Sequence, residues 1–198
     1  MSPSSNSTSP RLFENPVLER LSRVRPWFPI AFWGPIVAFA LRSHLAAGFD
    51  LVEGSAIFAA GFVVWTFVEY ALHRELFHWR TEASLGRRFV YLLHGVHHEF
   101  PNDPDRLLMP PAAAIPFAAA FALFFRAMLG PAIFPGFFAG FLTGYLVYDY
   151  SHFGAHFSDR FAAWFPAQKR SHMIHHFVDD GRGFGVSSPF WDRIFGTG

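Results

Sequence analysis

The histidines of this chain are numerous and regularly spaced, which indicates that they bind metal. Eleven histidines occur in 198 residues, and ten of them fall in four short groups that read HRELFH, HGVHH, HFGAH and HMIHH. Spacings of three and four residues place side chains on one face of a helix, so each of the last three groups predicts a one-sided patch of imidazoles. The ten are His73, His78, His94, His97, His98, His152, His156, His172, His175 and His176.

His78 and His44 do not fit this pattern of spacings. The five residues from His73 to His78 do not fit the helical repeat, so we expect the second to lie past a bend or a loosened turn. The eleventh histidine, His44, stands alone, and we interpret it as an ordinary hydrogen-bonded residue.

Ten imidazoles exceed the needs of one metal ion. Structural zinc takes four ligands and octahedral ions take six, so the simplest count is two ions with four or five imidazoles each and an open position. All-nitrogen ligation favours iron, zinc, copper or nickel over magnesium or calcium, and the spacing does not choose among these four. The absence of cysteine excludes cysteine-held iron–sulfur clusters and thiolate-ligated haem.

Two carboxylates precede histidines by one helical turn. Glu69 precedes His73, and Asp149 precedes His152. A metal-bound imidazole usually donates its second N–H to a carboxylate or carbonyl, and an acid at the end of an apolar stretch needs a reason to be there. We therefore expect Glu69 and Asp149 to support the metal ligands.

The elements that must position these groups are membrane helices. Charged residues make up 16% of the chain, against about a quarter in ordinary soluble domains. Four apolar stretches, at about residues 27–45, 52–72, 111–128 and 131–150, approach the roughly 20 residues that cross a bilayer. The pattern predicts an all-α integral membrane protein with four transmembrane helices in two hairpins.

Two hairpins would bring the histidines to one side of the membrane. The N-terminus, residues 73–108 and residues 151–198 would share one face, and most positive residues lie in these segments. The positive-inside tendency makes that face cytosolic. His73 and His152 would each lie just beyond the end of a span, at the membrane surface.

The first 26 residues are expected to stand apart from a single membrane domain at residues 27–198. Residues 1–10 are rich in Ser and Pro and are predicted to be disordered. Residues 11–26 carry four arginines and are predicted to form an amphipathic helix at the membrane surface. The formal net charge of +1 gives no argument for a nucleic-acid partner.

The ordered set of histidine groups resembles the histidine boxes of the fatty acid hydroxylase/sterol desaturase superfamily. HHEFPNDPDRLLMPP, residues 97–111, is similar to the segment after the second box in fatty acid 2-hydroxylases. GFGVSSPFWDRIFGTG, residues 183–198, resembles their C-terminal end, and sterol desaturases share its WDRIFGT portion. The resemblance covers about residues 65–198, and the RLLMPP stretch points to the 2-hydroxylases.

This resemblance implies a four-helix transmembrane base with a cytosolic helical cap and a dinuclear centre ligated by the ten histidines. It implies O2-dependent hydroxylation of a lipid acyl chain at C2. Well-known eukaryotic members carry a fused cytochrome b5 domain, which residues 1–26 could not form. We therefore expect a separate electron donor, either cytochrome b5-like or a ferredoxin with its reductase. The expected location is a bacterial cytoplasmic membrane, or the endoplasmic reticulum of a eukaryote.

The implied reaction sets expectations for the metal and the substrate site. An unactivated C–H bond calls for an oxidant made from O2, which redox-inert zinc cannot supply, so iron is the expected active metal. Zinc can occupy the same imidazoles in purified protein. The substrate should enter from the bilayer into an apolar cleft, whose candidate lining residues are Phe100, Leu107, Met109, Phe184 and Trp191.

Two alternatives remain at this stage. A carotenoid hydroxylase or a sterol desaturase would use a similar histidine set, and the RLLMPP segment argues against both. From another class, the chain could be a membrane protein that binds or transports metal. Transporters place their ligands near the bilayer midplane on broken helices, whereas these histidines are expected beyond the ends of the spans.

Overall fold

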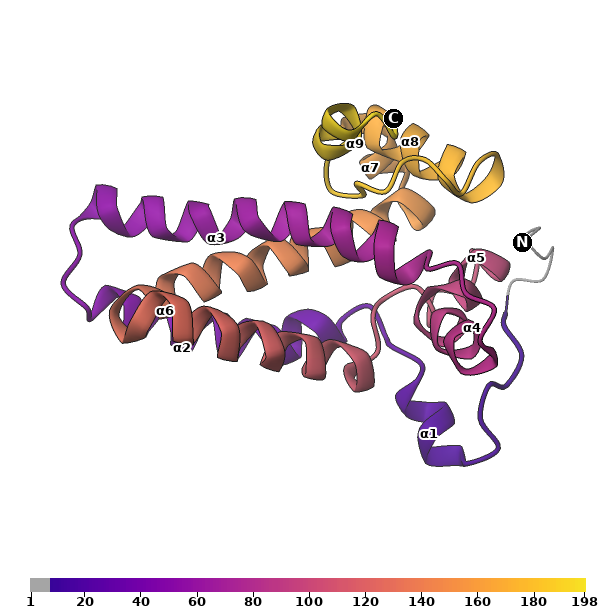
Figure 1. The fold of residues 1–198 in the computed structure, drawn as a ribbon, viewed down its shortest axis with the longest axis horizontal. Helices are drawn as coiled ribbons and strands as arrows, with labels where there is room; N and C mark the ends of the chain where they lie inside the picture. Colours follow the sequence, from indigo (N-terminus) through magenta and orange to yellow (C-terminus); the bar gives the residue numbers. More distant parts are fainter. Residues whose placement is uncertain (1–7) are drawn as a thin grey trace.

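A long helical bundle ends in a group of shorter helices (Figure 1). The structure, a computed structural model, describes residues 8–198, and within that range all regular structure is helical. The prediction of an all-helical protein is confirmed. The elements are α1 (Pro16–Leu21), α2 (Phe28–Leu45), α3 (Leu51–Ala71), η1 (Leu72–Phe77), α4 (Ser84–Val90), η2 (Tyr91–Gly95), α5 (Val96–Glu99), α6 (Pro111–Phe157), α7 (Asp159–Trp164), α8 (Pro166–Phe177) and α9 (Phe190–Phe195).

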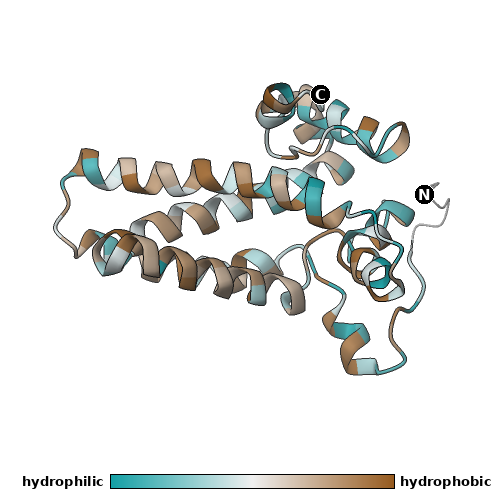
Figure 2. Ribbon diagram, viewed as in Figure 1, coloured by the Kyte–Doolittle hydropathy of each residue, from teal (hydrophilic) through white to brown (hydrophobic). Residues whose placement is uncertain are grey.

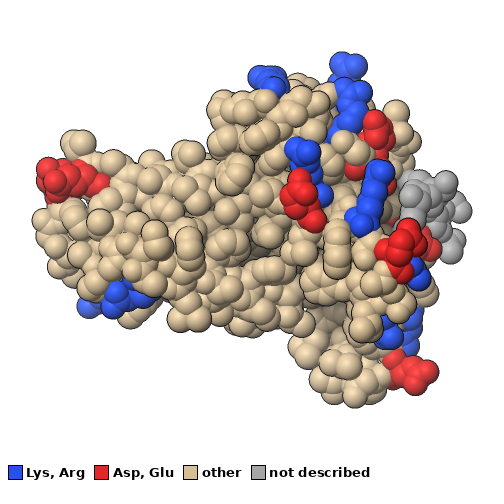
Figure 3. All heavy atoms as spheres, in the orientation of Figure 1, with Lys and Arg blue, Asp and Glu red and all other residues tan. Residues whose placement is uncertain are grey.

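The bundle has the surface of a membrane-embedded body. Three helical segments, residues 28–45, 51–77 and 111–157, are long and apolar enough to cross a bilayer. Apolar residues dominate the bundle helices, and charged groups gather at the short-helix end and at the opposite tip (Figures 2 and 3). Because the long surface between these ends shows almost no charge, it suits contact with hydrocarbon.

Helix α6 reverses direction at Gly130. This glycine has φ 71° and ψ 175°, a conformation that residues with a Cβ rarely adopt, and Pro131 follows it. Rings from the two sides of the turn pack together: the centroids of Phe121 and Phe141 are 5.1 Å apart and those of Phe125 and Phe137 are 4.8 Å apart. The helix therefore consists of two antiparallel arms, residues 111–129 and 131–157.

His73, His152 and His156 lie within continuous helical segments. The sequence had predicted that His73 and His152 follow the ends of two spans. The second arm of α6 continues to Phe157 and carries His152 and His156. Helix α3 passes directly into η1, a π-helical segment that contains His73. Both helical segments therefore continue past the predicted ends of the spans at residues 72 and 150.

The backbones of α3 and the second arm of α6 approach closely at two glycines. A Cβ atom built at Gly140 would lie 1.9 Å from the carbonyl oxygen of Phe58, and one at Gly61 would lie 1.9 Å from that of Phe137. Small residues allow such approach between membrane helices. The aromatic core that includes Trp65, Phe141 and Tyr145 packs beside this contact.

The N-terminal region is more ordered and less helical than predicted. Of the tail predicted to be disordered, residues 1–7 lie outside the described part of the chain, but Ser9 is buried and donates from its backbone N–H to Asp103 at 2.8 Å. The predicted surface helix at residues 11–26 shortens to the six residues of α1. A half-buried ion pair between Arg106 and Glu19, at 2.6 Å, joins α1 to the loop before α6.

We predict that Gly140→Ala lowers the free energy of unfolding by about 1–3 kcal/mol, because the added methyl group meets backbone that cannot rotate away. Gly34→Ala on α2 is the matched control. Its Cβ would have no neighbour closer than 3.9 Å, so we expect it to be neutral or slightly stabilising. Thermal unfolding in one detergent compares the two, and equal stability would contradict the close approach of α3 and α6.

Candidate metal centre

All ten histidines of the four groups lie together where the bundle meets the short helices. They form two sets of five, and within each set one ligand atom per residue lies within 4.8 Å of the others. We name them the proximal and the distal set. The proximal set is His73, His78, His94, His98 and His175, and the distal set is His97, His152, His156, His172 and His176.

A π-helical turn brings His73 and His78 into the same set. The backbone N–H of His78 donates to the carbonyl of His73 at 3.1 Å, which closes the wider turn of a π-helix. Five residues make about one such turn, so both side chains face the same side. The irregular spacing in the sequence thus has a regular structural cause. A second π-helical segment, η2, contains His94.

Adjacent histidines divide between the two sets. On α5, His98 belongs to the proximal set and His97 to the distal set, and on α8 the same holds for His175 and His176. Consecutive residues of a helix point about 100° apart, so each HH pair supplies one ligand to each side. The sets therefore adjoin: the rings of His98 and His176 stack with centroids 4.1 Å apart.

The Nε2 atoms of several rings point at one another. The Nε2 atom of His94 lies 3.0 Å from those of both His73 and His98. In the distal set, the Nε2 atom of His97 lies 2.9 Å from that of His152 and 3.1 Å from that of His176. One nitrogen cannot donate its single proton to two neighbours. Nitrogen atoms gathered in this way match what a cation would organise.

The surroundings keep these rings in the neutral form that metals require. Eight of the ten histidines are buried, and His78 and His156 are half-buried. Burial lowers the pKa of His94, His97 and His172 well below the usual value of 6.5, and neighbouring imidazoles lower it further. At neutral pH the rings are therefore uncharged and able to bind metal.

Backbone carbonyls orient two imidazole rings, those of His73 on η1 and His175 on α8. The Nδ1–H of His73 donates to the carbonyl of Phe184, and that of His175 donates to the carbonyl of Arg182, both at 2.6 Å. A proton held on Nδ1 leaves the Nε2 lone pair free for a metal ion. The loop at residues 182–184 therefore fixes the tautomer of two proximal histidines.

Glu69 holds that loop and makes no hydrogen bond to an imidazole within the described chain. Its carboxylate accepts from the backbone N–H groups of Val186 and Ser187, both at 2.8 Å, and from the Ser187 hydroxyl. We had expected a direct partner for His73. In the structure the effect is indirect, because the loop that Glu69 holds also carries the Phe184 carbonyl.

Asp192 is a buried support that the sequence reasoning missed. It is 0% exposed and accepts from the backbone N–H groups of Phe184 at 2.9 Å and Gly185 at 2.7 Å. The Thr197 hydroxyl donates to it at 2.8 Å. An acidic residue within the largely apolar segment PFWDRIF, residues 189–195, could have indicated this supporting role.

Asp149 belongs to a cluster of buried polar atoms that lack partners. No hydrogen bond of 3.5 Å or less reaches either oxygen of its carboxylate from the described residues, and the same holds for the Tyr145 hydroxyl and Trp65 Nε1. The Tyr145 hydroxyl and the backbone N–H of Met109 are the nearest groups that can donate to this carboxylate. The rings of Trp65 and Tyr145 are 5.3 Å apart. Buried polar groups without partners are costly, so such a cluster suits a ligand that carries polar atoms of its own.

The structure brings two of the five predicted substrate residues to this region. Phe184 packs against the proximal set, with its ring 5.6 Å from those of His73, His78 and His175. Met109 lines a narrow cavity of about 20 Å³ that also contacts Trp65 and Tyr145.

The other three predicted substrate residues have packing roles. Phe100 is buried, Leu107 packs with Val24 and Leu108, and Trp191 donates to the Thr66 hydroxyl at 3.0 Å. None of the three lines the narrow cavity that Met109 lines, so their role in substrate binding stays a prediction.

A larger apolar cavity of about 500 Å³ lies between the N-terminal segment, the α4–η2 helix and the start of α6. Its walls include Leu92, Leu93 and Val96, which share the helical stretch that carries His94, His97 and His98. Phe117 lines both this cavity and the narrow one beside Tyr145. The Phe117 side chain is therefore common to the walls of both cavities.

We predict that Glu69→Gln weakens metal binding to the proximal set by about tenfold, because it loosens the loop whose carbonyl orients His73. Glu75→Gln is the matched control, since Glu75 is exposed on the neighbouring turn. Competition with a chelator of known affinity measures the change. Equal affinities for the two variants would show that Glu69 does not act on the ligands through the loop.

Comparisons with known proteins agree on one family. The sequence model of the fatty acid hydroxylase family matches residues 58–197. A dihydroceramide fatty acyl 2-hydroxylase of Arabidopsis thaliana is 35% identical over 188 residues, which are 95% of this chain and 79% of that protein. A ceramide very long chain fatty acid hydroxylase of Saccharomyces cerevisiae is 37% identical and is matched over 48% of its length, by 94% of this chain.

A solved structure extends the similarity to the fold. The visible hydroxylase domain of full-length scs7p superposes with a TM-score of 0.87 at 37% identity. The match covers 94% of this chain and 70% of that one.

Proposed function

This chain belongs to the fatty acid hydroxylase family, and on that premise we propose that it is a membrane oxygenase that hydroxylates a lipid acyl chain at C2 with O2. The observation that carries the proposal is the pair of adjacent five-histidine sets at the end of an apolar bundle. The relatives named as fatty acyl 2-hydroxylases supply the position of attack.

We propose that each set holds one metal ion and that iron is the active metal. The gathered Nε2 atoms fit a cation at each set, and the carbonyl-fixed tautomers of His73 and His175 fit a cation at the proximal set. When bound, an iron pair supplies the redox chemistry with O2 that removal of hydrogen from a methylene group requires, which zinc in the same imidazoles lacks. The residues of the chain orient the ions, exclude water and position the substrate.

The polar cluster beneath the histidines supports the regiochemistry. C2 is bonded directly to the carbonyl carbon of an acyl group, so fixing that carbonyl fixes C2. The Tyr145 hydroxyl and Trp65 Nε1 can donate to a carbonyl oxygen, and the Asp149 carboxylate can accept from an amide N–H. We propose that these three groups hold the polar end of the substrate so that C2 faces the metals.

The apolar cavities support a path for the acyl chain. The cavity of about 500 Å³ falls in the usual range for small-molecule sites, and Phe117 lines both it and the narrow cavity. We propose that the chain enters from the bilayer beside α1 and passes Phe117 toward Tyr145.

The topology completes the proposal. Helices α2 and α3 and the two arms of α6 would cross the membrane four times, with the histidines on the cytosolic side where most positive residues gather. The reaction converts R–H, O2, two electrons and two protons to R–OH and water. A redox protein, cytochrome b5-like or a ferredoxin with its reductase, would deliver the electrons from that side.

The direct test is lipid analysis of cells that lack 2-hydroxylated lipids and express this chain. We expect 2-hydroxy acyl chains by mass spectrometry and two metal ions per purified chain. His97→Ala should abolish the product and lower the metal content, because its Nε2 lies at the centre of the distal set. His44→Ala is the control outside both sets. Oxygenated carotenoids or altered sterols in place of 2-hydroxy lipids would refute the proposed substrate class.

We predict that Tyr145→Phe lowers kcat/KM by about 10- to 100-fold and leaves the metal content unchanged, because a misplaced acyl group misaligns C2. Tyr150→Phe removes a hydroxyl from the same helix arm whose partner is the Pro26 carbonyl, and we expect near-normal activity. Kinetics with purified protein and a matched reductant provide the measurement. Full activity of the Tyr145 variant would remove the polar cluster from substrate positioning.

A further inference from the structure

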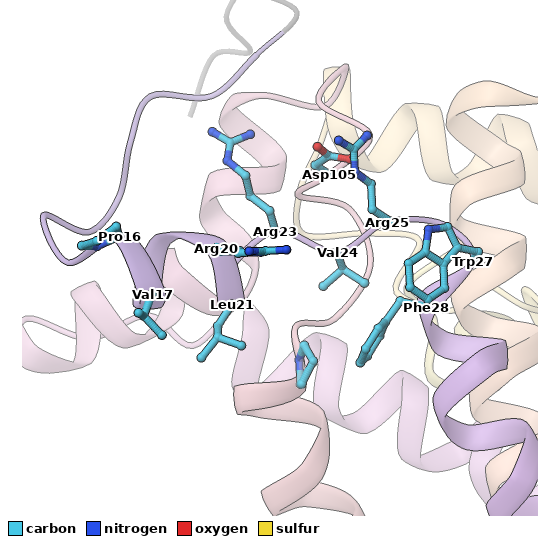
Figure 4. Close-up of a pocket in the computed structure, with 11 residues that line it drawn as sticks. Pro16, Val17, Arg20, Leu21, Arg23, Val24, Arg25, Trp27, Phe28 and Asp105 are labelled. Atoms are coloured by element: carbon cyan, nitrogen blue, oxygen red, sulfur yellow. The ribbon is translucent and has the colours of Figure 1, made fainter.

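A large cavity borders α1 on the side that faces the first turns of the membrane helices. Its volume is about 810 Å³, and it lies between α1, the α1–α2 connection and the beginning of α6 at Pro111. It contains none of the ten grouped histidines (Figure 4). The cavity is therefore separate from the candidate metal centre, although Leu21 lines both this cavity and the cavity of about 500 Å³ proposed for the substrate acyl chain.

One side of this cavity carries three arginines, Arg20, Arg23 and Arg25. Figure 4 shows the side chains of Arg23 and Arg25 on one side of the connecting segment. Arg25 lies 3.7 Å from Asp105, and Arg23 pairs with Glu19 at 3.0 Å. Arg20 is exposed and has no ion pair or hydrogen bond among residues 8–198. Arg23 also lies 3.5 Å from Asp103, so carboxylates match both Arg23 and Arg25. Arg20, which has no carboxylate partner among the described residues, leaves an excess of one positive charge.

The other side is apolar and open. The side chains of Leu21, Val24 and Phe28 point away from those of Arg23 and Arg25 (Figure 4), and Val17 continues this surface along α1. Val17 is 63% exposed and Leu21 is 48% exposed. Six helical residues would be marginally stable alone, so covering this apolar face would favour the helix.

The place of the cavity identifies what could cover it. Phe28 begins α2 and Pro111 begins α6, two of the segments long and apolar enough to span a membrane. Trp27, which is 64% exposed, lines the cavity at the same level, as aromatic residues do at membrane–water interfaces. The basic side would therefore meet headgroups and the apolar side would meet acyl chains.

We propose that this cavity binds an anionic phospholipid of the surrounding bilayer, distinct from the substrate. The phosphate group lies among Arg20, Arg23 and Arg25, and the upper part of an acyl chain covers Val17, Leu21 and Phe28. A soluble anion would satisfy the arginines but not the apolar wall, and a neutral lipid would leave the excess charge unmatched. The bound lipid anchors α1 and the loop at Asp105 to the membrane surface.

The test measures lipid retention by the purified full-length protein with native mass spectrometry. Phosphatidylglycerol and phosphatidylcholine with identical acyl chains are the probes. We expect preferential retention of phosphatidylglycerol, reduced about fivefold for each arginine removed, in Arg20→Gln and then in Arg20→Gln/Arg25→Gln. Arg126→Gln, an exposed arginine near the opposite tip of α6, removes the same charge and should leave retention unchanged.

Three results would overturn the proposal. They are equal retention of the two lipids by the unmodified protein, equal losses in the Arg20 and Arg126 variants, or full competition by glycerol phosphate, which would indicate a soluble anion. Arg20 has no partner to lose in the described structure, so the single variant gives a result even when the double variant is unstable. Because the experiment measures lipid binding, its result does not depend on whether the protein has the proposed hydroxylase activity.

Discussion

The convergence of ten neutral imidazoles on two adjoining points is the constraint on which the rest of the structure depends. Uncharged rings whose Nε2 atoms approach within about 3 Å crowd their lone pairs together, and burial removes the water that would otherwise separate them. Such an arrangement is unfavourable without a cation. The scaffold must therefore hold the rings in place, and its unusual features occur where it does so.

Three of these features act over different ranges. The π-helical turn at residues 72–77 places the His78 side chain on the same side as that of His73. The reversal at Gly130 returns the chain to the same end of the bundle, so that His152 and His156 meet histidines from α5 and α8. The C-terminal loop then closes over the proximal set, held by two buried acids, Glu69 and Asp192. The acids act through backbone N–H groups, and the carbonyls of the loop act on the rings.

The same architecture separates three chemical environments along the bundle axis. The imidazoles lie at the end of the bundle, the buried polar groups of Trp65, Tyr145 and Asp149 lie near them, and apolar cavities lie beside both. An acyl lipid carries a matching order of groups, with a reactive carbon next to a polar carbonyl and a long apolar chain. A basic cavity at α1, outside this line, is suited to a lipid of different charge.

Local patterns in the sequence determined much of this protein: the helical class, the apolar spans, the turn at Gly130-Pro131 and the set of histidines that meet. These follow from hydropathy, periodicity and turn chemistry, which act between near neighbours in the chain. Only the tertiary structure decided how His97 and His98 divide between two sets, why a carbonyl and not Glu69 orients His73, and why Ser9 is buried against Asp103. Each depends on contacts between residues far apart in sequence, whose geometry arises only when the whole chain packs.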